Sequence, residues 1–75
     1  MLAYVLISLQ TVDEKKVLEE LRAMSRIKEA HVLFGEWDIL AKIEASNPEE
    51  VATFVMDEIR NIPQVKLTST LIVAK

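Results

Sequence analysis

Hydrophobic and polar positions along the chain change their periodicity in a regular order. Residues 2–9 form a short apolar run that is rich in β-branched side chains and ends at Gln10, a pattern typical of a β-strand. From about residue 12 to residue 24, apolar side chains recur at helical spacing instead, which predicts an amphipathic helix. The apolar side chains that this helix should bury are Val17, Leu18, Leu21 and Met24.

Both predicted helices have favourable capping residues at their N-termini. Thr11 and Glu14 match a capping box, in which the Thr11 hydroxyl accepts from an early helix N–H and Glu14 reaches back to the Thr11 N–H. Asn47 is a preferred N-cap, and Pro48 suits the next position because no intrahelical N–H bond is needed there. We therefore expect one helix to start beside Thr11 and the other beside Asn47.

Three further segments alternate between apolar and polar side chains and predict strands. They cover residues 27–34, 37–45 and 65–74. Pro63 separates the second helix from the last strand because a proline ring cannot continue a helix. The side chains that the second helix should bury are Val51, Phe54, Val55 and Ile59.

The predicted order of elements is β-α-β-β-α-β. Right-handed crossovers with interleaved halves give an α+β, ferredoxin-like fold, a four-stranded antiparallel sheet in the order 4-1-3-2 with two helices on one face. The first strand is apolar on both faces, and Tyr4 and Leu6 belong to the face that the helices leave open. We therefore expect a dimer in which two sheets stack across a two-fold axis.

The composition favours association for a second reason. The 75 residues make a single domain, 1–75, and a domain of this size buries only about 60–65% of its unfolded surface. Yet 51% of the residues are hydrophobic, and the mean hydropathy is +0.20. Because the chain has no cysteine and one histidine, neither a disulfide nor a structural zinc site adds to the core. Oligomerisation remains as the source of added stability.

The charge distribution argues against several classes of partner. The net charge is −3, and the nine lysines and arginines are dispersed rather than clustered, so we expect no direct contact with nucleic acid. No apolar run approaches the roughly 18 residues of a membrane span, and the first four residues lack the basic region of a signal peptide. We expect a cytoplasmic protein with no membrane contact.

Few residues of the chain are suited to catalysis. His31 is the only side chain that is a base near neutral pH, and it lies in the middle of a predicted strand without an evident nucleophile. A glycine-rich phosphate loop is excluded by the presence of a single glycine. We therefore predict a protein that is not an enzyme and that uses no cofactor and no metal.

The most unusual residues of the chain lie together between two predicted strands. Gly35, the only glycine, predicts a chain reversal, and Trp37, the only tryptophan, packs on the hairpin or contacts a ligand. Asp38 either caps backbone N–H groups of the turn or accepts the ammonium group of a small zwitterion. Either free N–H groups of the turn or the hydroxyls of Thr68 and Thr70 receive the carboxylate of that ligand, although threonine is also common in strands.

Two motifs of the chain resemble one protein family. The segment Gly-Glu-Trp-Asp-Ile-Leu at residues 35–40 resembles the G-x-aromatic-D-apolar-apolar signature of the effector domain, or RAM domain, of the Lrp/AsnC (feast/famine) transcription regulators. Ile-Pro-Gln-Val at residues 62–65, followed by Thr-Ser-Thr at 68–70, is similar to the L-P-G-V and T-x-T ending of that domain. Two positions depart from the family pattern, Gln64 in place of glycine and Trp37 in place of tyrosine or phenylalanine.

The resemblance implies a domain that senses amino acids and assembles into rings. In that family, dimers associate further and bind small effectors, typically amino acids, where dimers meet. By motif position, the resemblance implies ligand contacts at Gly35, Trp37, Asp38, Thr68 and Thr70. Full regulators carry a helix-turn-helix before this domain, whereas this chain starts at the first strand, so we expect no DNA-binding domain and a possible role in mixed complexes with full-length Lrp/AsnC regulators.

Two other functions are compatible with the same fold. One is a small enzyme of the dimeric α/β-barrel kind, such as a cofactor-free monooxygenase or an isomerase, and the lone His31 argues against it. The other is a purely structural oligomerisation module without a ligand.

Overall fold

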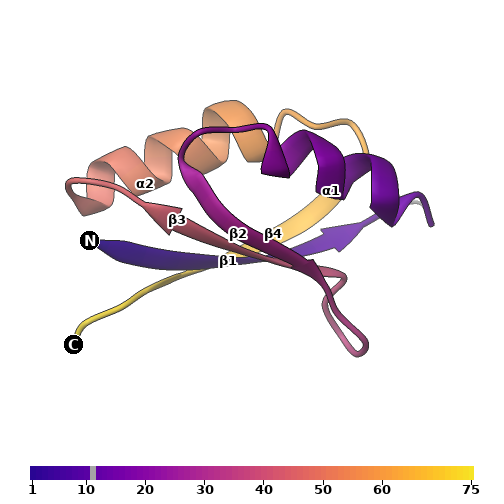
Figure 1. Cartoon of the computed structure of the whole chain (residues 1–75), viewed down its shortest axis with the longest axis horizontal. Coiled ribbons are helices and arrows are strands. Elements are labelled where there is room, and N and C mark those ends of the chain that lie inside the picture. The colour runs from indigo at the N-terminus through magenta and orange to yellow at the C-terminus, as the bar shows by residue number, and fades with distance from the viewer. Residues whose placement is uncertain (11) are drawn as a thin grey trace.

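Two helices cover one face of a four-stranded antiparallel sheet in the computed structural model, which describes residues 1–10 and 12–75 (Figure 1). The strand order is β2-β3-β1-β4, which is the predicted order 4-1-3-2 read from the opposite edge, so the predicted fold is confirmed. The elements are β1 (Leu2–Leu9), α1 (Glu14–Arg22), β2 (Ile27–Val32), β3 (Ile39–Glu44), α2 (Pro48–Phe54), a π-helical turn η1 (Val55–Ile59) and β4 (Val65–Ile72).

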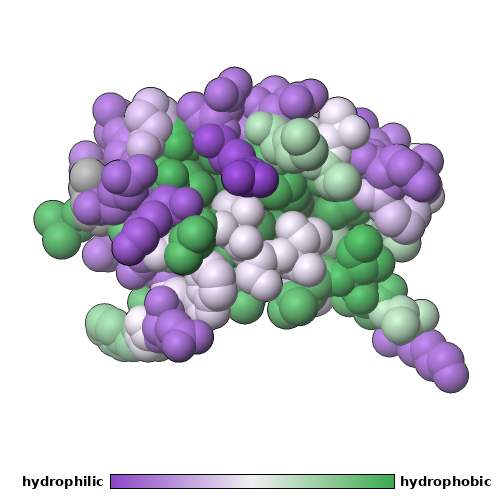
Figure 2. Space-filling view, turned by 180° about the vertical axis from the view of Figure 1, so that it is seen from behind, coloured by the Kyte–Doolittle hydropathy of each residue, from purple (hydrophilic) through white to green (hydrophobic). Residues whose placement is uncertain are grey.

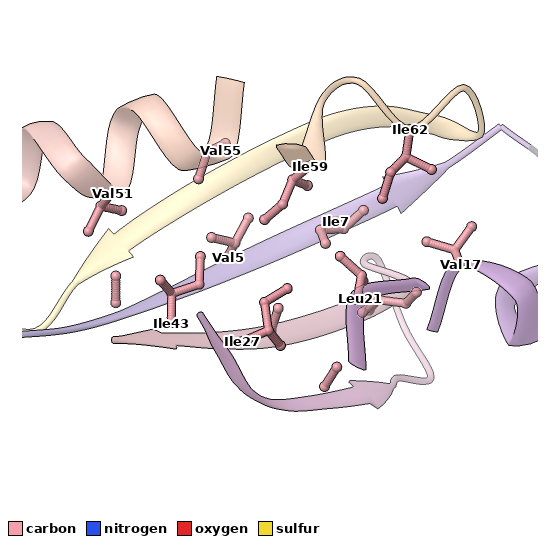
Figure 3. Close-up of a cluster of buried hydrophobic side chains, with 14 of the residues drawn as sticks. Val5, Ile7, Val17, Leu21, Ile27, Ile43, Val51, Val55, Ile59 and Ile62 are labelled. Carbon is pink, nitrogen blue, oxygen red and sulfur yellow. The ribbon is translucent and has the colours of Figure 1, made fainter. Parts of the chain in front are cut away.

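The hydrophobic core lies between the sheet and the two helices. Alternate side chains of the central strand β1 point into it, and Val5 and Ile7 are fully buried there (Figure 3). Full burial of such a side chain stabilises the fold by about 1.5–3 kcal/mol. The labelled side chains around them come from α1, β2, β3, α2, η1 and the turn after η1, and they are Val17, Leu21, Ile27, Ile43, Val51, Val55, Ile59 and Ile62.

Helix α1 is shorter than the predicted range of 12–24. It begins at Glu14 after the N-cap residue Asp13, and Thr11 of the predicted capping box lies outside the described residues. The helix ends at Arg22 because the chain turns there toward β2. The guanidinium of Arg22 donates to the Ala30 carbonyl oxygen at 2.7 Å from Nη2 and 3.1 Å from Nε, which attaches the end of α1 to β2.

Helix α2 begins as predicted and then changes its winding. The Asn47 side chain accepts from the Glu50 N–H at 2.8 Å, and Pro48 occupies the first position of the helix. From Val55 the helix widens into the π-helical turn η1, where the Arg60 N–H donates to the Val55 carbonyl at 2.8 Å. The sequence pattern did not predict this turn. It keeps both Val55 and Ile59 in the core.

The loop between β2 and β3 is longer than the predicted tight turn. The strands end at Val32 and restart at Ile39, which leaves residues 33–38 as the loop. A hydrogen bond of 2.8 Å from the Leu33 N–H to the Asp38 carbonyl closes its base. Gly35 has a φ of +132°, and a Cβ atom there would meet nothing within 4 Å, so glycine is needed for its backbone conformation rather than for space.

Candidate functional site

The sheet face opposite the helices carries an apolar strip. Tyr4 and Leu6 of β1 lie on it half-buried, and the register places Leu71 opposite Tyr4. On the same face of β4, Leu67 and Leu71 retain 57% and 52% exposure. Figure 2 shows hydrophobic residues along the lower margin, on the side away from the helices. The fold of one chain therefore leaves this strip only partly covered.

A polar cluster borders the apolar strip on β2 and β3. Glu29 lies 3.2 Å from His31 Nε2 and, through its other oxygen, 3.2 Å from the Lys42 ammonium. These hydrogen bonds, first from His31 and then from Lys42, lower the pKa of the Glu29 carboxyl. His31 is exposed on the sheet surface and contacts a carboxylate rather than a nucleophile.

The Asp38 side chain is held by the central strand β1 and not by backbone N–H groups of its own turn. Its Oδ2 accepts from the Leu9 N–H at 2.7 Å, and its backbone N–H donates to the Ile7 carbonyl at 2.9 Å. The pairing between β1 and β3 ends at Ile7 and Ile39, so beyond that pair the Asp38 carboxylate takes the place of a backbone acceptor for the Leu9 N–H. Its other oxygen, Oδ1, makes no hydrogen bond to the described residues.

The loop around Gly35 presents free donors and an exposed aromatic ring. No backbone N–H from Phe34 to Trp37 donates to any of the described residues. Trp37 is half-buried, whereas Phe34 is fully exposed at the tip, and Glu36 beside it is exposed as well. In Figure 1 the loop between β2 and β3 projects away from the body of the molecule.

Thr68 and Thr70 lie on the helix side of the edge strand β4. They pair with Ile7 and Val5 of β1, and both threonines line a cavity of about 340 Å³ between β4 and the α2–η1 helix. Figure 2 looks onto this side of the molecule, and hydrophobic residues are visible between the helix layer and the sheet. This α2–β4 cavity is also lined by Val51, Val55, Met56, Arg60 and Ile72.

The five predicted site residues fall into two groups in one chain. Gly35, Trp37 and Asp38 share the β2–β3 loop. Thr68 pairs with Ile7 on one side of β1, while Ile39, the neighbour of Asp38, pairs with Ile7 on the other. Since neighbouring strands lie about 4.8 Å apart, the two groups are separated by about 10 Å. One small amino acid therefore does not contact both groups within a single chain.

The sequence did not point to three groups that lie near these residues. The Leu9 N–H binds Asp38, the Arg60 guanidinium opens onto the α2–β4 cavity, and Gln64 Oε1 is buried without a hydrogen-bond partner among the described residues. Helical spacing from Met56 to Arg60 was the available signal for the second. The hydrogen bonding of a backbone N–H, such as that of Leu9, or of a glutamine amide, such as that of Gln64, produces no periodic pattern in the sequence.

A separate ion pair joins the first residues after α1 to the start of α2. Arg26 donates to Glu50 Oε1, which also accepts from the Ser46 N–H at 3.2 Å. The hydrogen bond from the Ser46 backbone, followed by that from Arg26, lowers the pKa of the Glu50 carboxyl. This pair stabilises the connection between the helices and lies away from the β2–β3 loop.

The described part of the chain contains neither a cluster of metal ligands nor a membrane-spanning helix. Among residues 1–10 and 12–75, no three His, Cys, Asp or Glu side chains are grouped as metal ligands. Within the same ranges, the helices are too short or too polar to cross a membrane.

Comparison with known proteins agrees with the fold and with the two sequence motifs. The family model described as the Lrp/AsnC ligand binding domain matches residues 2–75. The HTH-type transcriptional regulator FL11 of Pyrococcus abyssi is 36% identical over 75 residues, which are 100% of this chain and 49% of FL11. Across the curated relatives that match, this chain spans only 39–49% of their length.

Solved structures agree with this similarity. The crystal structure of FFRP-DM1 superposes with a TM-score of 0.90 at 35% sequence identity, covering 96% of each chain. The regulator NMB0573 of Neisseria meningitidis, solved as an L-Met complex, has the same fold at 20% identity, with a TM-score of 0.87 over 99% of this chain and 49% of its own. With the family model spanning nearly every residue, this chain belongs to the Lrp/AsnC ligand-binding domain family of transcription regulators.

Proposed function

We propose that this chain is a non-catalytic module that binds a small amino acid and assembles with further copies of itself. Membership of a ligand-binding domain family supports a binding role, and the L-Met complex of a structural neighbour supports an amino acid as the ligand. The whole of residues 1–75 acts as one such domain. Within residues 1–10 and 12–75, the His31 ring contacts the Glu29 carboxylate and no serine or threonine hydroxyl.

The position of Asp38 is the observation that carries this proposal. One carboxylate oxygen is fixed by the Leu9 N–H at 2.7 Å, so the side chain is oriented before any ligand arrives. The second oxygen has no partner among the described residues and accepts the ammonium group of the ligand. Orientation in advance lowers the entropy lost on binding.

The β2–β3 loop also supplies groups for the rest of an amino acid. Backbone N–H groups from Phe34 to Trp37 are free among the described residues, and they receive the ligand carboxylate. Trp37, which is half-buried, contacts the ligand side chain. Thr68 and Thr70 lie too far away in the same chain, so their hydroxyls join the site from another copy.

The substitution Asp38→Asn tests the role of the charge. Asparagine keeps an oxygen that accepts from the Leu9 N–H, so the loop is retained while the negative charge is lost. A thermal-shift screen of the twenty amino acids first identifies the ligand, and calorimetry then compares affinities. Loss of one charge-assisted hydrogen bond costs about 1.5–3 kcal/mol, so the variant should bind roughly ten- to a hundredfold more weakly.

Glu19→Gln is the matched control for this experiment. Glu19 is exposed on α1, and the substitution removes one negative charge as Asp38→Asn does. We expect it to bind the ligand with wild-type affinity. Equal affinity of wild type and Asp38→Asn, with the fold retained, would mean that Asp38 only caps β1 and that the proposed site is wrong.

The apolar strip on the open sheet face supports the assembly part of the proposal. Leu67 and Leu71 remain more than half exposed beside Tyr4 and Leu6. Stacking two such faces removes this surface from water, and each Å² of buried apolar area stabilises the dimer by about 25 cal/mol. A dimer formed through the sheet supplements the small core. In a two-fold dimer both copies contribute the same surface, so each sheet face packs against its own equivalent.

A further inference from the structure

We propose that the α2–β4 cavity of a single chain binds an aliphatic carboxylate. The hydrocarbon chain of the ligand lies inside the cavity, and its anionic head lies at Arg60 and Lys66. This site is built by α2, η1 and the edge strand β4 of one copy. It uses neither Asp38 nor the β2–β3 loop, so it is a second site that does not depend on the amino-acid site proposed above.

The wall of the α2–β4 cavity forms the apolar part of the site. Val51 and Val55 are buried there, whereas Met56 and Ile72 are partly exposed, and Figure 2 shows hydrophobic residues between the helix layer and the sheet on this side. The volume of about 340 Å³ lies within the range of about 300–1,000 Å³ that is typical of small-molecule sites. Because a cavity of about 150 Å³ holds benzene, this one has room for a chain of roughly eight to ten carbons.

Two cationic side chains adjoin this apolar wall. A second cavity of about 360 Å³, which we call the basic cavity, is lined by Arg60, Val65, Lys66, Leu67 and Thr68. Arg60 and Thr68 line both cavities, so the two adjoin. Neither the Arg60 guanidinium nor the Lys66 ammonium makes an ion pair or hydrogen bond with any residue that the structure describes. Both cations are therefore available to a ligand.

The charges along this edge favour an anion over an amino acid. No Asp or Glu side chain lines either cavity, although the chain has 12 acidic residues and a net charge of −3. Cavities elsewhere on the described surface include carboxylates, such as Asp57 between the helices and Glu29 beside β2. The ammonium group of an amino acid would face cations here without an acidic partner. A carboxylate on an apolar chain suits the site instead, because a guanidinium binds it through two parallel hydrogen bonds.

A series of carboxylates tests the apolar part of the site. Calorimetry near neutral pH compares hexanoate, octanoate and decanoate, each below the concentration at which it forms micelles. Each methylene that enters the cavity should strengthen binding by up to about fourfold. Octylamine has the chain of octanoate and the opposite charge, so it should bind much more weakly beside the two cations. Octylamine binding as tight as that of octanoate would overturn the proposal.

The substitution Arg60→Gln tests the anionic head. Arg60 is exposed, so the fold should be retained, and loss of the charge-assisted contact should weaken octanoate binding about tenfold. Lys16→Gln is the matched control, because it removes the same charge from the exposed surface of α1. We expect it to bind octanoate with wild-type affinity. An equal loss in the two variants would mean that net charge alone attracts the anion, and the site would be wrong.

The substitution Met56→Glu tests the cavity itself. The Met56 side chain is 63% exposed, so the fold tolerates the change, while a carboxylate at the cavity should repel the ligand and reduce its affinity more than tenfold. Met56→Gln has a similar shape without the charge and should retain most of the binding. Methyl NMR signals of Val51 and Val55 should shift when octanoate is added to wild type. Wild-type affinity in Met56→Glu would place octanoate elsewhere and contradict the proposal.

The variant Asp38→Asn separates this site from the amino-acid site. It should bind octanoate as wild type does, whereas a loss equal to that in Arg60→Gln would mean that no second site exists. Octanoate binding that depends on Arg60, without any amino acid found by the screen, would support this proposal and remove the amino-acid function. An amino acid that depends on Asp38, without octanoate binding to wild type, would support the function and overturn this proposal.

Discussion

The two faces of the sheet differ in how completely one chain buries them. On the helix side, Val5 and Ile7 of β1 are fully covered by side chains of α1, α2 and η1. On the open side, Tyr4 and Leu6 of the same strand are only half-buried, and Leu71 beside them is 52% exposed. Both sides carry apolar side chains of β1, so the helix side is covered within the chain, whereas the open side is covered only in the proposed dimer.

The substitution Leu6→Asp should have the largest effect, and that effect should be on association. A carboxylate in the stacked sheets would be buried without a partner, and burial of an unpaired polar group costs roughly 2–7 kcal/mol. We expect the variant to dissociate at concentrations where wild type associates, as measured by analytical ultracentrifugation. A wild-type protein that stays monomeric at micromolar concentration would contradict association through the open face of the sheet.

The substitution Ile7→Ala on the opposite face should affect folding instead. Ile7 is fully buried under the helices, and truncation of a buried isoleucine to alanine typically costs about 2–5 kcal/mol. Urea unfolding should show this loss at every protein concentration, in contrast to the concentration-dependent effect of Leu6→Asp. If the loss of stability caused by Ile7→Ala disappeared on dilution, the helix side would not be stabilised within one chain, and the contrast between the two faces would be wrong.

Acid should weaken the helix side by a smaller amount through Glu50. Its pKa is lowered from 4.5 in the folded chain by the Ser46 N–H and by Arg26. The stability from these contacts is therefore complete above about pH 4.5 and is lost as pH falls through the lower folded value. Glu50→Gln should be less stable than wild type at neutral pH, and the difference should shrink in acid.

Denaturant midpoints measured across that pH range check the prediction. Glu19→Gln controls for the loss of one charge and should follow the wild-type pH curve. If the difference in denaturant midpoint between wild type and Glu50→Gln stayed constant down to the lowest pH, the ionised Glu50 carboxylate would not be stabilised by the Ser46 N–H and Arg26.

The divided site shows where sequence reasoning stops. The G-x-W-D segment was found from residue types alone, and the loop with Gly35 at positive φ agrees with it. The same reasoning joined Thr68 and Thr70 to Asp38 as one site, although β1 separates them in the fold. Motif position orders residues along the chain, whereas the distance between β3 and β4 depends on which strand lies between them.

Local sequence patterns predict the order of the strands and of the two helices and the face that each one buries, although they miss the π-helical turn η1. Alternation with period two in β1, helical spacing in α1 and α2, and the Asn47 cap are local properties, because they depend on side-chain geometry within a few residues. Two features follow from the folded arrangement alone: the Asp38 carboxylate accepts from the Leu9 N–H, and Arg60 lines the α2–β4 cavity. Those contacts join residues far apart in the chain. They depend on how whole helices and strands pack together, so no short sequence pattern predicts them.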